Sequence, residues 1–482
     1  MKYPFTKIKS AVLPILLCVA LVSCSNGLKN KETKIEKENI HEQEQPNIIF
    51  ILADDMGYNV PGSYGGKVIQ TPNIDKLAKE GMLFTNSYAG NSVCAPSRAS
   101  LMTGLHTGHT SVRGNTGGIS IKSDDITIGE VLRQSGYTTG VFGKWGLGDF
   151  ETEGVAEKQG FDEFFGYYHQ IHAHFYYTDY LWRNSEKIKT LNKPGDSASF
   201  SHYRIMKEMK SFITKNKDKP FFCYSSWTLP HTDDLGDPQI PETDPAYLIY
   251  KDKPWSDAEK KYAAMNTLVD YSVGEVKELV EQLGIEKNTI IIFASDNGGG
   301  YDFDELFDVS GKFKGFKHQF YEGGIKAVSI FYWDGKIQAG SVSDYPNYFA
   351  DIMPTFAELA GANKHLPKEL DGISLVPTLL NKGEQKQHQY MYWELPAFDW
   401  DNNVYNPEEL QQAIRVGDWK LLRHHTEKLW ELYNIKNDPE EKNNMADKKP
   451  EMVKKLIEKI KENRTEMPKQ IEPEMPEAKW YR

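Results

Sequence analysis

The chain has few cysteines, and their positions leave little room for disulfide bonds. Only four of the 482 residues are cysteine: Cys18, Cys24, Cys94 and Cys223. The first two lie in a segment that is typical of an export signal, so only Cys94 and Cys223 remain in the rest of the chain. A small fold held together by several disulfide bonds is therefore excluded.

The chain also lacks an excess of positive charge. It has 57 Lys and Arg against 68 Asp and Glu, a formal net charge of −11. Proteins that bind nucleic acid usually carry a basic surface, so this balance argues against a nucleic-acid partner. It does not exclude a small anionic substrate, because a local basic pocket can coexist with an acidic exterior. The aromatic content of 12% is that of a globular protein with a large core.

The apolar run near the N-terminus, residues 11–22, is too short to cross a bilayer as a helix. It follows several lysines and precedes Leu21-Val22-Ser23-Cys24, which is similar to a bacterial lipobox. We therefore predict a lipoprotein signal peptide at 1–24, a lipid anchor on Cys24 and a flexible, polar tether at 25–45. Such a protein is exported to the cell envelope, in the periplasm or at the outer membrane. The alternative is an ordinary secretory signal that is cleaved nearby.

Apolar strands alternate with helices from residue 46 onward. Strands are predicted at 47–53, 138–142, 221–225 and 289–295, and helices at 71–80, 126–136, 203–217 and 257–283. This order predicts an α/β fold with a large, mostly parallel mixed sheet sandwiched by helices, which we place at 46–384. Short strands at 390–393, 412–416, 419–423 and 428–432, followed by a helix at 450–463, predict a small antiparallel α+β subdomain at 385–482.

Polar residues follow two of the buried strands. Asp54 and Asp55 come directly after the first, and Asp296 and Asn297 come directly after the strand at 289–295. Asp is common in turns, so the first pair alone is ambiguous. The carboxyl ends of parallel strands meet at one edge of a sheet, so the two pairs are expected to lie together. Carboxylate and amide oxygens suit Ca²⁺, whereas the scarcity of nearby His and Cys makes zinc less apt.

Cys94 begins the segment Cys94-Ala95-Pro96-Ser97-Arg98. On chemistry alone this is either a structural thiol or a reactive one whose pKa Arg98 lowers from one helical turn away. With the following Ala99-Ser100-Leu101-Met102-Thr103-Gly104, the segment resembles the signature of type I sulfatases, members of the alkaline phosphatase superfamily. The resemblance implies that Cys94 is oxidised to formylglycine by a maturation enzyme. It also implies an alkaline-phosphatase-like fold and hydrolysis of sulfate esters.

The resemblance extends over roughly residues 46–470. It includes Phe142-Gly143-Lys144-Trp145-Gly146-Leu147-Gly148, then Pro230-His231, then Gly315-Phe316-Lys317 ahead of Tyr321-Glu322-Gly323-Gly324-Ile325. It implies a calcium ion held by Asp54, Asp55, residue 94, Asp296 and Asn297. Lys144 and Lys317 are then expected to bind sulfate oxygens, Arg98 to orient the aldehyde hydrate, and Asp296 to accept the attacking proton. His231 is the candidate general acid, because His titrates near neutral pH.

One position departs from the commoner family pattern. Gly146 stands where the family often has a His that helps to resolve the sulfated intermediate. The stretch His169-Gln170-Ile171-His172-Ala173-His174 is a candidate source of a replacement, with His174 as the first choice and His172 as the second. Both are then expected to contact the sulfate or the sugar. A surface loop and a separate metal site are the alternatives for this stretch.

Bacterial exported sulfatases of this kind often resemble enzymes that act on carbohydrates. A sulfated glycosaminoglycan, mucin or algal glycan is therefore the expected substrate class. Four aromatic residues are candidates for stacking on sugar rings, although aromatics are equally common in cores: Trp182, Trp393, Phe398 and Trp400. Two rival hypotheses remain open. One is a phosphonate or phosphate-ester hydrolase of the same superfamily, and the other is a glycan-binding lipoprotein that has lost its activity.

Overall fold

The computed structural model describes residues 45–115, 119–233, 235–399, 404–425 and 428–467. Residues 1–44 hold the predicted signal peptide, Cys24 and nearly all of the predicted tether, and they lie outside the described residues. Within the described ranges, no helix is long and apolar enough to cross a membrane.

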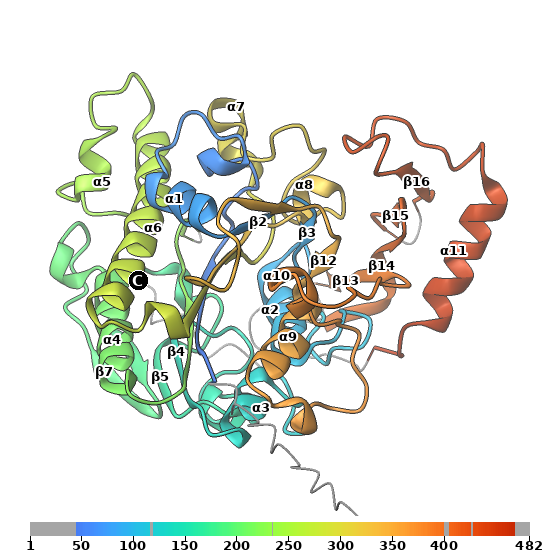
Figure 1. Cartoon of the computed structure of the whole chain (residues 1–482). Helices are drawn as coiled ribbons and strands as arrows, with labels where there is room; N and C mark the ends of the chain where they lie inside the picture. The colour runs from blue at the N-terminus through green and yellow to red at the C-terminus, as the bar shows by residue number, and fades with distance from the viewer. Residues whose placement is uncertain (1–44, 116–118, 234, 400–403, 426–427, 468–482) are drawn as a thin grey trace, which may run out of the picture. The chain divides into compact units, whose positions relative to one another are not determined.

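A ten-stranded mixed sheet lies at the centre of the main domain (Figure 1). Its middle five strands are parallel, in the order β9 (Thr289–Ser295), β1 (Asn47–Ala53), β8 (Phe221–Ser226), β4 (Thr138–Lys144) and β5 (Glu163–Tyr167). Outside β9 come β10 (Ser329–Tyr332), β2 (Met82–Phe84) and β11 (Ser341–Ser343), and outside β5 come β6 (Tyr180–Arg183) and β7 (Glu186–Lys189). The predicted α/β fold class is confirmed.

Helices cover both faces of this sheet, and the sequence of β1 shows why. Successive side chains of a strand point to opposite faces. Ile49 and Ile51 pack with α1 (Pro72–Glu80), α4 (Ser201–Asn216) and α6 (Asp257–Gln282). Ile48 and Phe50 pack on the other side with α2 (Cys94–Thr103), α3 (Ile128–Gln134) and α9 (Ile352–Leu359). Because β1 is buried on both faces, its residues are apolar at nearly every position, which explains the continuous apolar run in the sequence.

Capping residues explain where two of the predicted helices begin. Thr127 and Glu130 form a capping box at the start of α3, and Ser256 and Glu259 form another at the start of α6. In each case the side chains satisfy backbone N–H groups that the first helical turn leaves unpaired. The helices therefore start at 128 and 257, within two residues of the expected bounds.

A second, antiparallel sheet follows the main domain. Its strands are β13 (Met391–Asp399), β14 (Val404–Val416), β15 (Trp419–Arg423) and β16 (Glu431–Asn434). Leu456 and Ile460 of α11 (Pro450–Glu462) pack on one face of this sheet, as predicted. The last strand starts at 431 rather than at the predicted 428, because Leu432 and Tyr433 are its inward-facing apolar residues. The boundary at residue 385 stays a prediction.

The described chain also contains short elements besides its 3₁₀ turns. They are the two-stranded pair β3 (Ser87–Tyr88) and β12 (Asn347–Tyr348), and the single-turn helices α5 (Pro245–Leu248), α7 (Asp304–Phe307), α8 (Glu322–Ile325) and α10 (Val376–Leu379). Tyr88 and Tyr348 of the pair pack with Trp393 of β13. The small sheet is thereby in contact with the segment that leads into α2.

Candidate active site

The carboxyl ends of neighbouring parallel strands bring the polar pairs together. Ala53 of β1 and Ser295 of β9 are register partners, so the residues that follow them leave the sheet side by side. The backbone N–H of Asp296 donates to the Ala53 carbonyl at 3.0 Å, and that of Asp55 donates to Asp296 Oδ1 at 3.1 Å. The expected meeting of the two pairs at one sheet edge is therefore what the structure shows.

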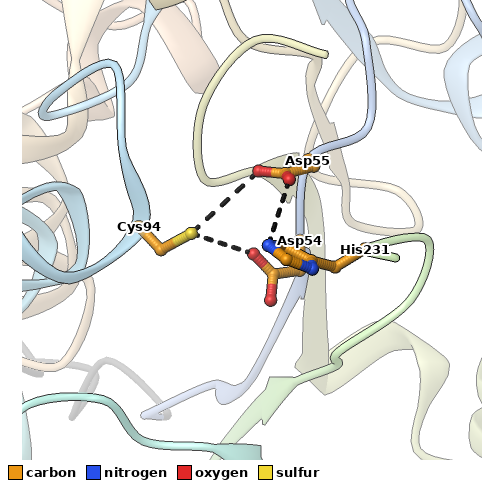
Figure 2. Close-up of side chains that lie close together, drawn as sticks. All are labelled: Asp54, Asp55, Cys94 and His231. Atoms are coloured by element: carbon orange, nitrogen blue, oxygen red, sulfur yellow. Dashed lines mark hydrogen bonds and ion pairs between the residues drawn. The ribbon is translucent and has the colours of Figure 1, made fainter. Parts of the chain in front are cut away.

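Asp55 has an unusual backbone conformation, with φ of 67°. Only a few per cent of residues other than Gly adopt this left-handed region. In an extended strand the side chains of Asp54 and Asp55 would point to opposite faces. The turn at Asp55 instead directs both carboxylates toward one thiol, since Cys94 Sγ lies 3.2 Å from Asp54 Oδ1 and 4.0 Å from Asp55 Oδ1 (Figure 2).

Cys94 lies in the first turn of α2, and its side chain is 0% exposed. Both Cys94 and Cys223 are free and buried. Burial first, and the nearby Asp54 carboxylate second, raise the pKa of the Cys94 thiol well above its ordinary value. Cys94 is therefore not a thiol of low pKa, because burial and the Asp54 charge outweigh the nearby cations. An unmodified thiol here is protonated at neutral pH and a weak nucleophile.

Arg98 is buried on the inner side of the site. Its Nη2 lies 2.7 Å from Asp296 Oδ2 and 3.6 Å from Asp54 Oδ1, and its Nη1 donates to the Lys144 carbonyl at 3.2 Å. Arg98 also donates to Ser226 Oγ at the end of β8. Despite this pairing, burial raises the pKa of Asp296 to about 7, with the Asp54 charge as the second cause.

Two lysines pair with the two carboxylates of the first strand end. Lys144 Nζ, at the end of β4, lies 2.6 Å from Asp54 Oδ2, and Lys317 Nζ lies 2.6 Å from Asp55 Oδ2. Burial acts to raise the pKa of Asp54, but Lys144 and the other nearby cations outweigh it and hold this pKa well below its ordinary value. Both strand-end carboxylates are therefore ionised beside ammonium groups.

Two of the predicted histidines join this cluster, and one does not. His231 Nε2 lies 3.0 Å from Lys317 Nζ, and His174 Nε2 lies 3.3 Å from Lys144 Nζ, with the two imidazole rings stacked 3.9 Å apart. His172 is directed elsewhere, since its Nε2 bonds Thr178 Oγ1 at 2.7 Å and its ring packs against Tyr167. The structure therefore separates the first choice from the second.

The titration of His231 differs from the expectation. Burial, and then the Lys317 charge, lower its pKa to about 4, and burial lowers the pKa of His174 well below its ordinary value. Both rings are neutral near pH 7 in this state of the protein. A group that protonates a leaving oxygen from this position then does so with the N–H of a neutral ring or after bound anionic substrate has raised its pKa.

The oxygen donors at this edge of the sheet, rather than the thiol and the imidazole beside them, suit a hard cation. Four ligand groups lie within 4.8 Å of one another, from Asp54, Asp55, Cys94 and His231 (Figure 2). Asn297 donates to Asp55 Oδ1 at 2.6 Å, while its own Oδ1 is buried and has no hydrogen-bond partner among the described residues. An unpartnered buried oxygen next to carboxylates is what a Ca²⁺-type ligand set requires.

A second cluster of potential ligands, His106, His109 and Asp371, is a poor metal site. Its ligand atoms also lie within 4.8 Å of one another. However, the two imidazole rings are stacked 4.1 Å apart with 24° between their planes. Ring nitrogens bind metal in the plane of the ring, so nearly parallel rings cannot both point at one ion. His109 Nδ1 instead bonds Asp371 at 2.8 Å, which ties the segment after α2 to the segment before α10.

A cavity of about 300 Å³ opens beside Asp55, His231 and Lys317. Tyr301 and Phe316 line its outer part, with their rings 5.2 Å apart. The sequence did not single out either residue. Of the aromatics it did single out, Trp182 and Trp393 are buried in apolar clusters away from this cavity, and Trp400 lies outside the described residues.

Sequence reasoning also missed Ser226, Asn115 and Gln170. Ser226 ends β8, a parallel neighbour of β1, so the strand-end rule that found Asp54 applied to it too. Asn115 Oδ1 accepts from the Ala95 backbone N–H at 2.8 Å and from Gln170 Nε2 at 2.6 Å. No local signal marks these two residues, because their roles come from contacts between distant segments.

Two family models match the chain. The model described as "Sulfatase" matches residues 46–362, and "N-sulphoglucosamine sulphohydrolase, C-terminal" matches residues 311–470. The chain is 26% identical to an N-acetylglucosamine-6-O-sulfatase of Bacteroides thetaiotaomicron, over 96% of this chain and 93% of that protein. It is 31% identical to the human N-acetylgalactosamine-6-sulfatase, over 70% of this chain and 66% of that protein.

Solved structures show the same fold. A crystal structure of Ps i-CgsB in complex with k-i-k-neocarrahexaose superposes with a TM-score of 0.76 at 28% identity, covering 89% of this chain and 96% of that one. The phosphonate monoester hydrolase of Agrobacterium radiobacter superposes with a TM-score of 0.60 at 19% identity, covering 88% of this chain and 96% of that one. At that identity the second likeness concerns the fold alone, so the fold does not choose between sulfate and phosphonate esters.

Proposed function

Because this chain belongs to the sulfatase family and hydrolyses sulfate esters, we propose that it acts on a sulfated carbohydrate with a formylglycine made from Cys94 and with Ca²⁺. The observation that carries the proposal is the setting of Cys94. A fully buried thiol with a raised pKa, facing two carboxylates, is unsuited to act as a thiolate. Conversion to an aldehyde supplies, on hydration, a hydroxyl that does not depend on that pKa.

The charges of the site support binding of a sulfate ester. Three carboxylates face three cationic side chains, so these groups balance one another: Asp54, Asp55 and Asp296 against Arg98, Lys144 and Lys317. A divalent cation added to this set leaves an excess of positive charge that attracts an anionic ester. Lys144 and Lys317 then donate charge-assisted hydrogen bonds to the sulfate oxygens.

Asp54, Asp55, Asp296 and Asn297 are the residues that would hold Ca²⁺. The ion supplies Lewis-acid stabilisation of charge on the sulfate oxygens. The residues themselves are fixed by the fold, because Arg98 holds Asp296 Oδ2 and Asn297 Nδ2 holds Asp55 Oδ1. The unpartnered Asn297 Oδ1 is the strongest support for a resident hard cation.

Proton transfers fall to groups on either side of residue 94. Asp296 is the candidate acceptor for the proton of the attacking hydroxyl, because its carboxylate lies in the same cluster as residue 94 and interacts with it electrostatically. His231 borders the cavity and is the candidate donor to the leaving oxygen. His174, stacked on His231 and 3.3 Å from Lys144, is the candidate second contact to the sulfate.

A sugar is the proposed leaving group. The cavity beside His231 presents Tyr301 and Phe316 as apolar surfaces and Asp302 and His318 as polar ones, a mixture that suits a carbohydrate. Relatives named as N-acetylglucosamine- and N-acetylgalactosamine-6-sulfatases support this substrate class. A screen of sulfated monosaccharides and glycan fragments, varying the position of the sulfate, tests it. Activity on aryl sulfates with none on any sulfated sugar would contradict it.

Mass spectrometry tests the modification. The peptide containing residue 94, taken from active enzyme, is expected to be lighter than the Cys form by the mass difference between a thiol and an aldehyde. An unmodified thiol in fully active enzyme would overturn the proposal. The conversion requires a maturation enzyme in the producing cell.

Relative turnover of an aryl sulfate and a phosphonate ester separates this function from phosphonate hydrolysis.

The N-terminal sequence supports a further part of the proposal, export and anchoring by a lipid on Cys24. Labelling with a radioactive fatty acid is expected to mark the wild-type chain and not the Cys24→Ala variant. Fractionation of the producing cells should find the wild type in the membrane fraction. Release of the wild type as a lipid-free protein would favour an ordinary secretory signal instead.

A further inference from the structure

Gly146 lies two residues beyond Lys144 and has φ of +73°, a conformation that favours glycine. Its backbone N–H donates to the Tyr168 carbonyl at 3.0 Å, which joins it to the segment before Gln170. A Cβ atom at position 146 would lie 2.7 Å from Gln170 Oε1 and 3.8 Å from Arg98 Cδ. The carboxamide of Gln170 therefore occupies the space that a side chain at 146 would fill, beside Arg98.

The orientation of this carboxamide follows from a backbone group. The N–H of Ala95 can only donate, so the Asn115 atom 2.8 Å from it is the oxygen. The same oxygen lies 2.6 Å from the amide of Gln170, which must therefore present its NH₂ group. Gln170 Oε1 is then the atom that faces Gly146. It is buried, and it has no hydrogen-bond partner among the described residues.

These contacts end at the nucleophile. The first N–H groups of a helix have no partner within the helix and need acceptors from elsewhere. Asn115 supplies the acceptor for Ala95, the residue after Cys94 in the first turn of α2. Gln170, which is 1% exposed, fixes the Asn115 amide in the orientation that this bond needs.

We infer that Gln170 is a positioning residue that holds residue 94 in place through Asn115. Gly146 leaves the space that the Gln170 side chain needs. This inference rests on the proposed role of residue 94 as the nucleophile. An amide does not titrate near neutral pH, so Gln170 moves no proton. Its free Oε1 accepts a hydrogen bond from a hydroxyl or water donor, and it does not bind sulfate, whose oxygens are acceptors only.

The first test replaces Gln170 by Met, which keeps the volume and removes both polar atoms. The matched control is Gln159→Met, because Gln159 is also 1% exposed with an unpartnered Oε1 but lies outside the site. Rates are expressed per molecule of converted enzyme, from mass spectrometry of the residue 94 peptide. We expect a kcat about 10–100-fold lower in Gln170→Met with KM within threefold, typical of a lost positioning contact. Gln159→Met is expected to lower the melting temperature and leave kcat within twofold.

A kcat within twofold of wild type in folded Gln170→Met, or an equal loss in Gln159→Met, would overturn the inference. Should Gln170→Met not fold, Gln170→Leu also removes both polar atoms while keeping an apolar side chain of similar volume, with the same expected fall in kcat. If this inference fails, the wild type still releases sulfate and still carries the modification. If the proposed function fails, the wild type itself lacks the modification, so the two failures are distinguishable.

A double-mutant cycle tests the steric part. Gly146→Ala places a Cβ atom against Gln170 Oε1 and is expected to lower kcat by displacing that side chain. If so, Gly146→Ala lowers kcat by a larger factor in the wild-type background than in the Gln170→Ala background, where only the backbone strain at φ of +73° remains. Losses that simply multiply would show that the two positions act separately, and the inference would fall.

Discussion

Two of the buried charge clusters in the described part of the chain can be compared, and only one of them lies at the candidate active site. The active-site cluster consists of Asp54, Asp55, Asp296, Arg98, Lys144 and Lys317. The C-terminal cluster consists of Glu322, Lys326, Arg415, Lys420 and Glu441, and it joins α8 to the small sheet. Lys420 Nζ lies 2.8 Å from both Glu322 Oε1 and Glu441 Oε1, and the Glu322 backbone N–H donates to Glu441 Oε2 at 2.6 Å.

Perturbed titration does not distinguish the two clusters. Burial raises the pKa of Asp296 to about 7 in one and that of Glu441 to about 7 in the other. Both clusters border a cavity, but of the two only the active-site cluster has a nucleophile position, and its Asn297 Oδ1 has neither a hydrogen-bond nor an ion-pair partner among the described residues. A shifted pKa therefore identifies a buried ion network, whereas a buried ligand oxygen without any partner, next to a nucleophile position, points to a site that takes a ligand.

The largest expected effect comes from the nucleophile position. Cys94→Ala removes one sulfur atom and little volume, so sulfate release should fall below detection while the circular dichroism spectrum stays unchanged. Its control is Cys223→Ala, a buried thiol outside the site that should cost stability alone. Turnover by Cys94→Ala would mean that another residue supplies the nucleophile.

Removal of the cation is expected to have the next largest effect on activity. Treatment with EGTA should lower kcat/KM by about a hundredfold or more, since a bound metal contributes several kcal/mol of charge stabilisation. Added Ca²⁺ should restore the rate and, at a hundred times its Kd, stabilise the fold by about 2.7 kcal/mol. Asn297→Ala should need more Ca²⁺ for the same recovery. Full activity after chelation would show that the site works without a metal.

One lysine from each cluster gives the sharpest contrast. Lys317→Met should lower kcat/KM by about 10²–10³-fold, the loss of about 3–4 kcal/mol of transition-state stabilisation. Lys420→Met should leave kcat/KM within twofold and destabilise the fold by about 3–5 kcal/mol, because it removes the cation that the buried Glu322 and Glu441 carboxylates share. Steady-state kinetics and urea unfolding of both variants check this. If Lys420→Met loses activity without losing stability, the C-terminal cluster serves catalysis as well.

The smallest effect concerns stability against pH. Burial raises the pKa of Glu441 from 4.5 to about 7, against the opposing charge of Lys420. Between these values the native chain holds a proton that the unfolded chain has lost, so the free energy of unfolding falls as pH rises from about 4.5 to 7. Glu441→Gln should remove this pH dependence, which amounts to about 1–3 kcal/mol of unfolding free energy over the whole range. Unfolding of Ca²⁺-loaded protein at several pH values measures it, with the neighbouring Glu440→Gln as the control.

The sequence predicted those parts of the site that depend on strand ends and on motif. Asp54 and Asp296 followed from one geometric rule, that parallel strands end at a common edge. Cys94, Lys144 and Lys317 followed from the resemblance, and the structure brings their side chains to the same place. The strand at 47–53 and the helix predicted at 257–283 were recognisable because burial on two faces and helical periodicity leave local patterns.

The remainder depends on contacts that no local pattern records. His172 and His174 are two residues apart, yet only His174 faces Lys144, because a single 3₁₀ turn sends the two side chains to different neighbours. The partnership of Asn115 with Gln170 joins segments 55 residues apart. The raised pKa of Cys94 likewise comes from packing, since the sequence shows Arg98 nearby but not that Asp296 holds its guanidinium group.

The complete burial of residue 94 also has a consequence for timing. Val93, its neighbour, packs with Trp393 and Ala413 of the small sheet, so a part of the chain that is made well after α2 covers the first turn of α2. A protein catalyst is far too large to reach a side chain that solvent does not touch. The oxidation that we propose must therefore precede folding, during synthesis or export, and a chain that folds too early stays inactive for good.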